Sequence, residues 1–208
     1  MQPSHILIAD DHDVVRRGIR EILRGEFPDV EIGEAANSDE LLVRMRERQW
    51  NLVLLDVLMP GLPVVKAIEE ILTIDAEIRI LVLTVIAETE YAVRVIRSGG
   101  HGYITKQHAT SELINAVHRV LGGGTYLTDE AMLALARGGA QSAHVTLSDR
   151  ELEVMCQIAR GRAVKEIAFD LGVSIKTVST YVMRIREKTG LQNYVEMTRY
   201  ALQHNLVE

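Results

Sequence analysis

The chain has 208 residues, of which 47% are hydrophobic and 25% charged, a balance that excludes a disordered chain and predicts one large or two small globular domains. Its net charge of −6 divides into −7 for residues 1–145, with 14 basic and 21 acidic groups, and +1 for residues 146–208, with 9 and 8. Charge alone therefore does not indicate a nucleic-acid-binding domain, which is often more basic. The apolar stretches are only as long as strands, and we find no signal segment. The single cysteine, Cys156, is expected to pack in a core. These features predict a cytoplasmic protein without a membrane span.

Five short apolar segments alternate with helical patterns over the first 121 residues. The segments are rich in β-branched residues, as buried parallel strands are, and lie at residues 5–9, 30–32, 52–56, 79–84 and 101–105. Helical periodicity follows each, at about residues 13–23, 38–48, 64–72, 88–98 and 111–121. In the first helix the predicted buried face begins with Val14, and in the second the predicted N-cap is Ser38. Five consecutive βα units predict an α/β domain with a doubly wound, five-stranded parallel sheet.

Polar residues stand where four of these strands end: Asp10 and Asp11, Asp56, Thr84, and Lys106. The carboxyl ends of parallel strands form one edge of the sheet, where ligands bind. Three carboxylates that lie close together need a cation, and oxygen ligands with open positions suit Mg²⁺. A magnesium ion, a lysine and a hydroxyl around one carboxylate are what phosphoryl transfer requires, with Asp56 as the nucleophile that becomes an aspartyl phosphate.

In these residues and their spacing, residues 4–121 closely resemble the CheY-like receiver domain of bacterial two-component response regulators. The motifs that carry the resemblance are Asp10-Asp11, Asp56 with Met59-Pro60-Gly61, Thr84, and Tyr103-Ile104-Thr105-Lys106. The resemblance implies that a sensor histidine kinase phosphorylates Asp56. It also implies a Mg²⁺ ion held by the three acids and the backbone carbonyl of Leu58. Thr84 and Tyr103 would form a switch pair, in which Thr84 bonds the phosphoryl group and the Tyr103 ring turns inward.

The loop after the phosphorylation site departs from the family pattern. Relatives usually have an acidic or small residue and then glycine after the Met-Pro-Gly motif, whereas this chain has Leu62-Pro63-Val64-Val65. Because proline and valine restrict the backbone, we expect the loop to follow another path. An alternative function is therefore a phosphorylation-independent DNA-binding regulator whose receiver is a dimerisation scaffold. A phosphatase of the haloacid dehalogenase type would need a second Asp where the chain has Leu58, so we expect no enzyme. His12, beside the acid pair, is expected to pack or to face solvent rather than to bind metal.

Residues 122–144 are rich in glycine and small residues around a short helical pattern at residues 129–137, and they predict a flexible tether. The predicted domains are thus residues 1–121, a linker at 122–144, and residues 145–208. In the last of these, Ser148 and Glu151 form a capping box at the start of a helix. Helical patterns follow at about residues 164–171, 175–188 and 194–203, with a tight turn at Gly172-Val173 between the first two.

Two helices joined by a tight turn could be any helical hairpin, but the flanking sequence is more specific. The chain has Leu147-Ser148-x-x-Glu151, Gly161, Lys165-Glu166-Ile167-Ala168 and Ser174-x-Lys176-Thr177-Val178. This pattern strongly resembles the helix-turn-helix DNA-binding domain of the LuxR family. With the receiver in front, the whole chain looks like a response regulator of the NarL/FixJ subfamily, with a weaker similarity to GacA-type members. The resemblance implies transcription regulation by binding of promoter DNA as a homodimer, with RNA polymerase as a further expected partner.

In such a domain the recognition helix enters the major groove with its N-terminal end. Residues expected at base edges are Ser179, Thr180 and Met183, and those expected at phosphates are Lys165, Lys176, Thr177, Tyr181 and Arg184. Many relatives have lysines where this chain has Ser179 and Met183, so fewer and more apolar base contacts are expected. On the last helix, Val195, Thr198 and Leu202 form a stripe that either pairs two domains or packs within one.

Overall fold

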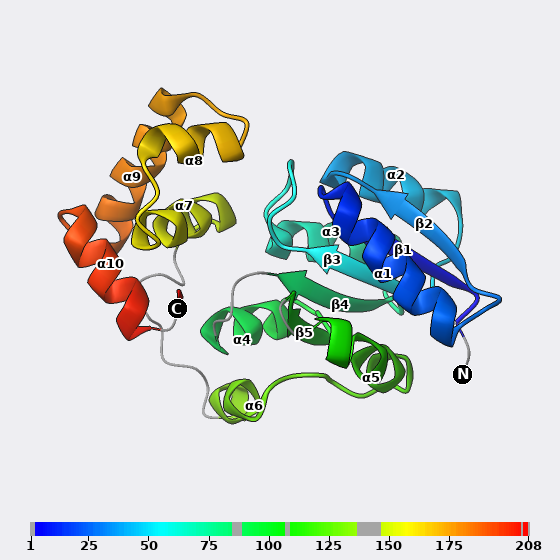
Figure 1. Ribbon diagram of the computed structural model, residues 1–208. Helices are drawn as coiled ribbons and strands as arrows, with labels where there is room; N and C mark the ends of the chain where they lie inside the picture. The colour runs from blue at the N-terminus through cyan, green and yellow to red at the C-terminus, as the bar shows by residue number, and fades with distance from the viewer. Residues whose placement is uncertain (1–2, 85–88, 107–108, 137–146, 205, 208) are drawn as a thin grey trace. The chain divides into compact units, whose positions relative to one another are not determined.

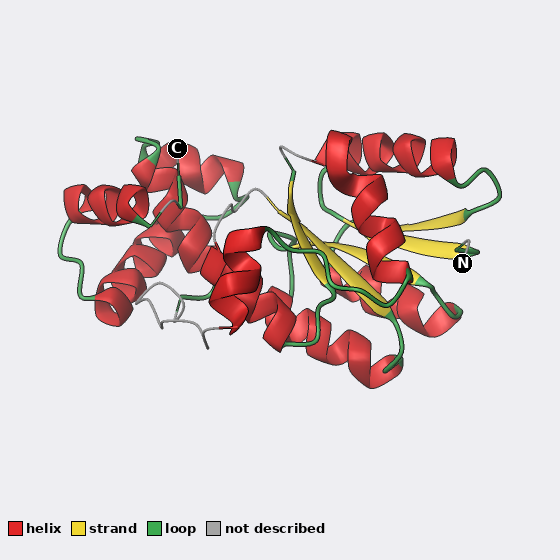
Figure 2. Cartoon of the chain, turned by 90° about the horizontal axis from the view of Figure 1, so that it is seen from below, coloured by secondary structure: helices red, strands yellow, loops and turns green. Residues whose placement is uncertain are grey.

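The computed structural model describes residues 3–84, 89–106, 109–136, 147–204 and 206–207. The chain divides into two units, one of residues 1–85 with 92–138 and one of residues 86–91 with 139–208, and each is described by itself. An α/β arrangement makes up the first unit and helices make up the second (Figures 1 and 2). Within the described ranges, none of the helices has the length and apolar character needed to cross a membrane.

The described part of the first unit holds a five-stranded parallel sheet in the order β2-β1-β3-β4-β5. Its strands are β1 (His5–Ala9), β2 (Glu31–Ala35), β3 (Leu52–Asp56), β4 (Arg79–Thr84) and β5 (Gly102–Thr105). All five residues of β3 are buried, as expected for a central strand covered on both faces. The predicted doubly wound α/β fold is confirmed.

Helices cover both faces of this sheet (Figure 1). They are α1 (Asp13–Glu26), α2 (Ser38–Glu47), α3 (Val64–Ile74), α4 (Thr89–Arg97) and α5 (Ala109–Leu121), followed by α6 (Asp129–Ala136). The first residue of the predicted helix at 88–98 lies outside the described residues. One core joins α1 and α5 to the sheet, with Ile19 and Leu23 of α1 among its buried residues. The prediction that Val14 belongs to the buried face is wrong, because this residue is 82% exposed while Val15 packs against the core.

The prediction that Ser38 caps α2 is also wrong. The N-cap is Asn37, whose side-chain oxygen accepts a hydrogen bond from the Glu40 amide at 2.8 Å. Ser38 is fully buried, its amide donates to the Pro60 carbonyl at 3.1 Å, and its Oγ accepts from the Leu62 amide at 2.8 Å. The Ser38 hydroxyl therefore holds the loop after β3, and Asn37, the residue before Ser38, caps the helix.

Glycine is required in that loop. Gly61 has a φ of +111°, and a Cβ atom there would lie 1.9 Å from Ser38 Oγ. Helix α3 then starts at Val64, directly after Pro63. The unusual Leu62–Val65 sequence thus gives a loop whose backbone is hydrogen-bonded to the start of α2.

The segment after α5 contacts the sheet, so the expected flexible tether does not begin at residue 122. The Tyr103 amide donates to the Tyr126 carbonyl at 2.9 Å, and the Tyr126 amide donates to the His101 carbonyl at 3.1 Å. Since β5 is an edge strand, its backbone groups need partners, and this segment supplies them. Residues 137–144 of the expected linker lie outside the described residues.

The second unit contains α7 (Asp149–Ala159), α8 (Val164–Asp170), α9 (Ile175–Thr189) and α10 (Tyr194–Gln203). The predicted capping box is confirmed, because Ser148 and Glu151 exchange hydrogen bonds at the start of α7. Glu151 is buried and also accepts from Lys188 Nζ at 2.6 Å, which ties α7 to α9. The core residues of the second unit include Leu152, Met155, Cys156, Ile167, Val178, Ile185, Met197 and Ala201.

Candidate functional site

Three strands of the first unit deliver charged side chains to one place. Asp10 follows β1, Asp56 ends β3 and Lys106 follows β5. Lys106 Nζ lies 2.6 Å from Asp10 Oδ2 and 2.7 Å from Asp56 Oδ2. Both acids are buried, with residue exposures of 1% for Asp10 and 4% for Asp56. The structure thus brings together Asp10, Asp56 and Lys106, three of the strand-end residues that the sequence analysis expected to meet.

The electrostatics of this cluster favour an added cation. Burial raises the pKa of Asp56, and the charge of Asp10 raises it further, while Lys106 acts in the opposite direction. Burial lowers the pKa of Lys106, but the charges of Asp56 and Asp10 outweigh it and hold that pKa above its ordinary value. Asp56 Oδ1 is buried and has no hydrogen-bond partner among the described residues. One ammonium therefore leaves a carboxylate oxygen unsatisfied, and this oxygen-rich donor set fits a hard divalent ion.

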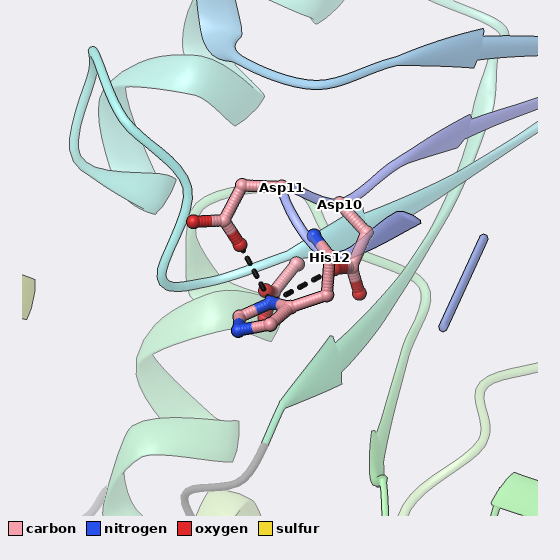
Figure 3. Close-up of side chains that lie close together, drawn as sticks. Asp10, Asp11 and His12 are labelled. Atoms are coloured by element: carbon pink, nitrogen blue, oxygen red, sulfur yellow. Dashed lines mark hydrogen bonds and ion pairs between the residues drawn. The ribbon is translucent and has the colours of Figure 1, made fainter. Parts of the chain in front are cut away.

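Asp11 and His12 lie beside the buried Asp10 (Figure 3). His12 Nδ1 is 2.8 Å from Asp11 Oδ1 and 3.3 Å from Asp10 Oδ1. One possible ligand atom from each of Asp10, Asp11, His12 and Asp56 falls within 4.8 Å of all the others. The expectation that His12 faces solvent is confirmed, because its side chain is 65% exposed. Sequence reasoning did not place its ring nitrogen next to the carboxylates, for which its position directly after the acid pair was the signal available.

Arg16 is a second residue that sequence reasoning missed. Its guanidinium donates to the Asp10 carbonyl at 2.7 Å, to Glu34 at 3.1 Å and to Asp13 at 3.2 Å. These bonds join the start of α1 and the edge strand β2 to the backbone of the loop that carries Asp10. The available signal was a basic residue on the first turn of the helix after the acids.

Of the other predicted receiver residues, two lie in the sheet and one lies in the loop after β3. Thr84 ends β4 and is fully buried, Tyr103 in β5 is 7% exposed, and Leu58 in the loop after β3 is 9% exposed. The β4–β5 register pairs Thr84 with Thr105 and Val82 with Tyr103. Because side chains alternate along a strand, Thr84 and Tyr103 point to the same face of the sheet.

In the second unit, the residues expected to contact DNA lie on α8 and α9. Those that are exposed are Lys165, Lys176, Ser179, Met183 and Arg184, and those that are half-buried are Thr177, Thr180 and Tyr181. Within the described part of the chain, the charged groups of Lys165, Lys176 and Arg184 have no ion-pair partner. These cations are thus available to an external anion such as a phosphate.

The small hydroxyl side chains of α9 are already bonded within the helix. Ser179 Oγ donates to the Ile175 carbonyl and Thr180 Oγ1 to the Lys176 carbonyl, both at 3.0 Å. Thr177 Oγ1 lies 2.8 Å from the Oγ of the capping residue Ser174. In this arrangement Ser179 and Thr180 present oxygen lone pairs outward, so they can accept hydrogen bonds from a partner without rearranging.

The stripe of Val195, Thr198 and Leu202 on α10 was expected either to pair two domains or to pack within one. Met197 and Ala201 face the core, whereas Val195 is 75% exposed and Leu202 is 51% exposed. A shallow groove of about 440 Å³ is lined by Tyr194, Val195, Thr198, Arg199, Leu202 and Gln203. The stripe is therefore on the surface, and packing within one domain is wrong for it.

Two protein families match the chain. The response regulator receiver domain matches residues 6–118, and the luxR family of bacterial regulatory proteins matches residues 145–201. Response regulator UvrY of Escherichia coli strain K12 is 32% identical over 207 residues, which cover 97% of this chain and 95% of UvrY. Response regulator GacA of Pseudomonas aeruginosa strain PAO1 is 33% identical over 212 residues, which cover 98% and 97%.

Solved structures give the same likeness over the full length. RcsB from Salmonella enterica serovar Typhimurium, bound to promoter rprA in the presence of the phosphomimetic BeF3−, is 27% identical. The match has a TM-score of 0.63 and covers 95% of this chain and 97% of that one. Both units of the chain therefore have counterparts in one solved protein.

Proposed function

Because this chain belongs to the response regulators, which join a receiver domain to a LuxR-type DNA-binding domain and regulate transcription through phosphorylation, we propose that Asp56 is its phosphoryl acceptor. The observation that carries the proposal is the buried cluster in which Lys106 Nζ lies within 2.7 Å of Asp10 and of Asp56. Among the described residues Asp56 Oδ1 has no hydrogen-bond partner, and the ammonium of Lys106 lies beside the other oxygen of the same carboxylate.

The metal of the site is proposed to be Mg²⁺, held by Asp10, Asp11, Asp56 and the backbone carbonyl of Leu58. Buried carboxylate oxygens with an unsatisfied lone pair support this assignment. When bound, the ion would offset the negative charge that phosphoryl transfer brings to the pocket. Arg16, which bonds the Asp10 carbonyl at 2.7 Å, would keep the acid pair in place.

The donor would be a phosphohistidine of a sensor histidine kinase, since receivers take their phosphoryl group from such kinases. An Asp56 oxygen attacks phosphorus, the P–N bond breaks, and the leaving imidazole takes a proton. The Lys106 ammonium would bind the phosphoryl oxygens, because the charges of Asp56 and Asp10 keep its pKa above the ordinary value and the group protonated.

The switch is proposed to run through Thr84 and Tyr103. Both are buried on the same face of neighbouring strands, so a phosphoryl group that draws the Thr84 hydroxyl changes the space next to the Tyr103 ring. Two packings of one core can differ by a few kcal/mol, and the new charge-assisted bond would favour one of them.

The output is proposed to be promoter binding by a homodimer. Lys165, Lys176 and Arg184 would hold phosphates together with Thr177 and Tyr181, and base edges would meet Ser179, Thr180 and Met183. The exposed apolar groove on α10 supports pairing of two second units. Pairing would double the few phosphate contacts of a unit with a net charge of only +1. RNA polymerase as a third partner stays a prediction.

The test is the intact mass of the protein after incubation with a small phosphodonor, with and without Mg²⁺. One added phosphoryl group that needs Mg²⁺ is expected for the natural chain and none for Asp56→Asn. The DNA affinity of the two forms, measured by fluorescence anisotropy, then gives the effect of phosphorylation on output. No mass gain in the natural chain would refute Asp56 as acceptor.

The loop after β3 favours one alternative, a phosphorylation-independent regulator whose receiver acts as a scaffold. Hydrogen bonds from Leu62 to Ser38 and from Ser38 to Pro60 hold this loop against α2, which would limit its movement on phosphorylation. If Asp56 accepts the group but DNA affinity and dimerisation stay unchanged, the scaffold function is the better assignment.

A further inference from the structure

We propose that the acidic pocket of the first unit also binds a first-row transition-metal ion, with His12 as a nitrogen ligand beside Asp10, Asp11 and Asp56, and that it binds Zn²⁺ more tightly than Mg²⁺. This inference rests on the proposed metal site, to which it adds a ligand and a second class of metal. His12 is not needed for Mg²⁺, which is bound by oxygen ligands.

The geometry of His12 carries the proposal. Its Nδ1 lies 2.8 Å from Asp11 Oδ1 and 3.3 Å from Asp10 Oδ1, so the ring nitrogen is already among the carboxylate oxygens (Figure 3). Its backbone amide donates to Asp10 Oδ1 at 2.8 Å, and His12 is the N-cap residue of α1. The main chain therefore holds the imidazole at the pocket. The side chain is 65% exposed, which leaves the ring room to turn toward an ion.

The pocket itself has an unsatisfied acceptor that points to a ligand. Asp56 Oδ1 is buried and unpartnered in the described part of the chain, although Lys106 reaches Asp56 Oδ2. Ligand atoms of all four residues lie within 4.8 Å of one another. A cation among them would satisfy that oxygen and gain the imidazole as a ligand.

The donor set decides the metal class. Carboxylates alone favour Mg²⁺, Ca²⁺ or Mn²⁺, whereas imidazole favours Zn²⁺ and its first-row neighbours. One nitrogen with three carboxylates is a set that Zn²⁺ accepts, as catalytic zinc sites with histidine and glutamate ligands illustrate. Zn²⁺ bound here would compete with Mg²⁺ for the same acids, so His12 would set the metal selectivity of the receiver.

The chain offers a matched control for histidine binding at the surface. His118 Nε2 lies 2.7 Å from Glu26 Oε1, nearly the same distance as in the His12–Asp11 pair. His118 is absent from the cluster of potential metal ligands found in the described residues. If Zn²⁺ bound at any exposed histidine–carboxylate pair, replacing either His12 or His118 would lower the Zn²⁺ affinity of the protein.

The experiment is calorimetric titration of the full chain with Mg²⁺ and with Zn²⁺, for the natural protein, His12→Phe and His118→Phe. We expect His12→Phe to weaken Zn²⁺ binding by at least about tenfold, because even partners of metal ligands are worth about 10–100-fold. Its Mg²⁺ affinity should change by less than twofold, and His118→Phe should alter neither. Spin-echo spectroscopy of the Mn²⁺-loaded protein adds a direct readout, a ¹⁴N coupling that His12→Phe removes.

The outcomes separate this inference from the proposed function. If Mg²⁺ and Zn²⁺ bind, Asp56→Asn weakens both, and His12→Phe weakens neither, the magnesium site stands and the role of His12 is refuted. If His118→Phe lowers Zn²⁺ affinity as much as His12→Phe does, the zinc is held by scattered surface histidines and the inference is overturned. If neither ion binds the natural chain in the pocket, the proposed metal site fails as well.

Discussion

Replacing Lys106 by methionine removes the ammonium between Asp10 and Asp56 while keeping an unbranched side chain. Its Nζ is 2.6 Å and 2.7 Å from the two carboxylates, and both acidic side chains are only 2% exposed. Removal of one partner from a buried ion pair costs about 3–5 kcal/mol. Because the Lys106 side chain is 15% exposed and therefore not fully desolvated, we expect a loss of about 3 kcal/mol in magnesium-free buffer, the lower end of this range.

The assay is urea unfolding of the full chain, monitored by tryptophan fluorescence, which reports on the first unit. Trp50 is the single tryptophan of the chain, is 7% exposed, and donates from Nε1 to the Arg44 carbonyl at 2.9 Å. With a slope of about 1–3 kcal/mol per M, the urea midpoint should fall by roughly 1–3 M. Lys66→Met is the matched control, because Lys66 Nζ is 2.6 Å from Glu69 but both side chains are exposed. Its midpoint should not move measurably.

Magnesium should then compensate for the lost ammonium. An ion at a hundred times its Kd adds about 2.7 kcal/mol to the stability of the state that binds it. Without Lys106 no lysine charge repels the ion, so at equal Mg²⁺ concentration the midpoint should rise more in the variant than in the natural chain. An unchanged midpoint in magnesium-free buffer, or an equal response to Mg²⁺, would refute the view of Lys106 as the counter-ion of the two acids.

Three further predictions use other features of the structure. Gly61→Ala should destabilise the first unit by about 1–3 kcal/mol, since φ is +111° and the new Cβ would meet a buried serine oxygen, whereas Gly18→Ala, inside α1 with open space around it, should stabilise by about 0.5–1 kcal/mol; the tryptophan assay measures both. Burial raises the pKa of Glu151, but its lysine and serine bonds outweigh this and lower it, so its stabilising effect is present above the ordinary value of about 4.3 and is lost as pH falls. Glu151→Gln should therefore lower the melting temperature by circular dichroism at pH 7 and reduce the further loss in acid; an equal acid loss in both proteins would contradict this. Lys176→Ala should weaken promoter binding alike for all sequences and reduce the slope of log affinity against log salt by about 1, as measured by fluorescence anisotropy.

The amino-acid sequence by itself determined the fold class and the kinds of residue in the pocket. Apolar runs such as Leu52–Asp56 predict buried strands because a parallel strand covered on both faces has no polar side to show. An acid or a lysine directly after such a run must lie at the carboxyl edge of the sheet, whatever the packing elsewhere. Local rules also predicted the capping box of Ser148 and Glu151, whose two partners are three residues apart.

Tertiary structure decided what depends on partners distant in sequence. Ser38 is a good cap by residue type, yet its hydroxyl bonds the Leu62 amide, 24 residues away, and Asn37 caps the helix. Likewise, Tyr126 pairs with the edge of β5, where a glycine-rich sequence predicted a free tether. The exposure of Val14 follows from the way α1 packs on the sheet, and only the folded sheet brings Asp56 within 4.8 Å of Asp10, Asp11 and His12. Periodicity and caps reflect neighbours within one or two turns of chain, whereas these contacts exist only after the strands have paired and the core has formed.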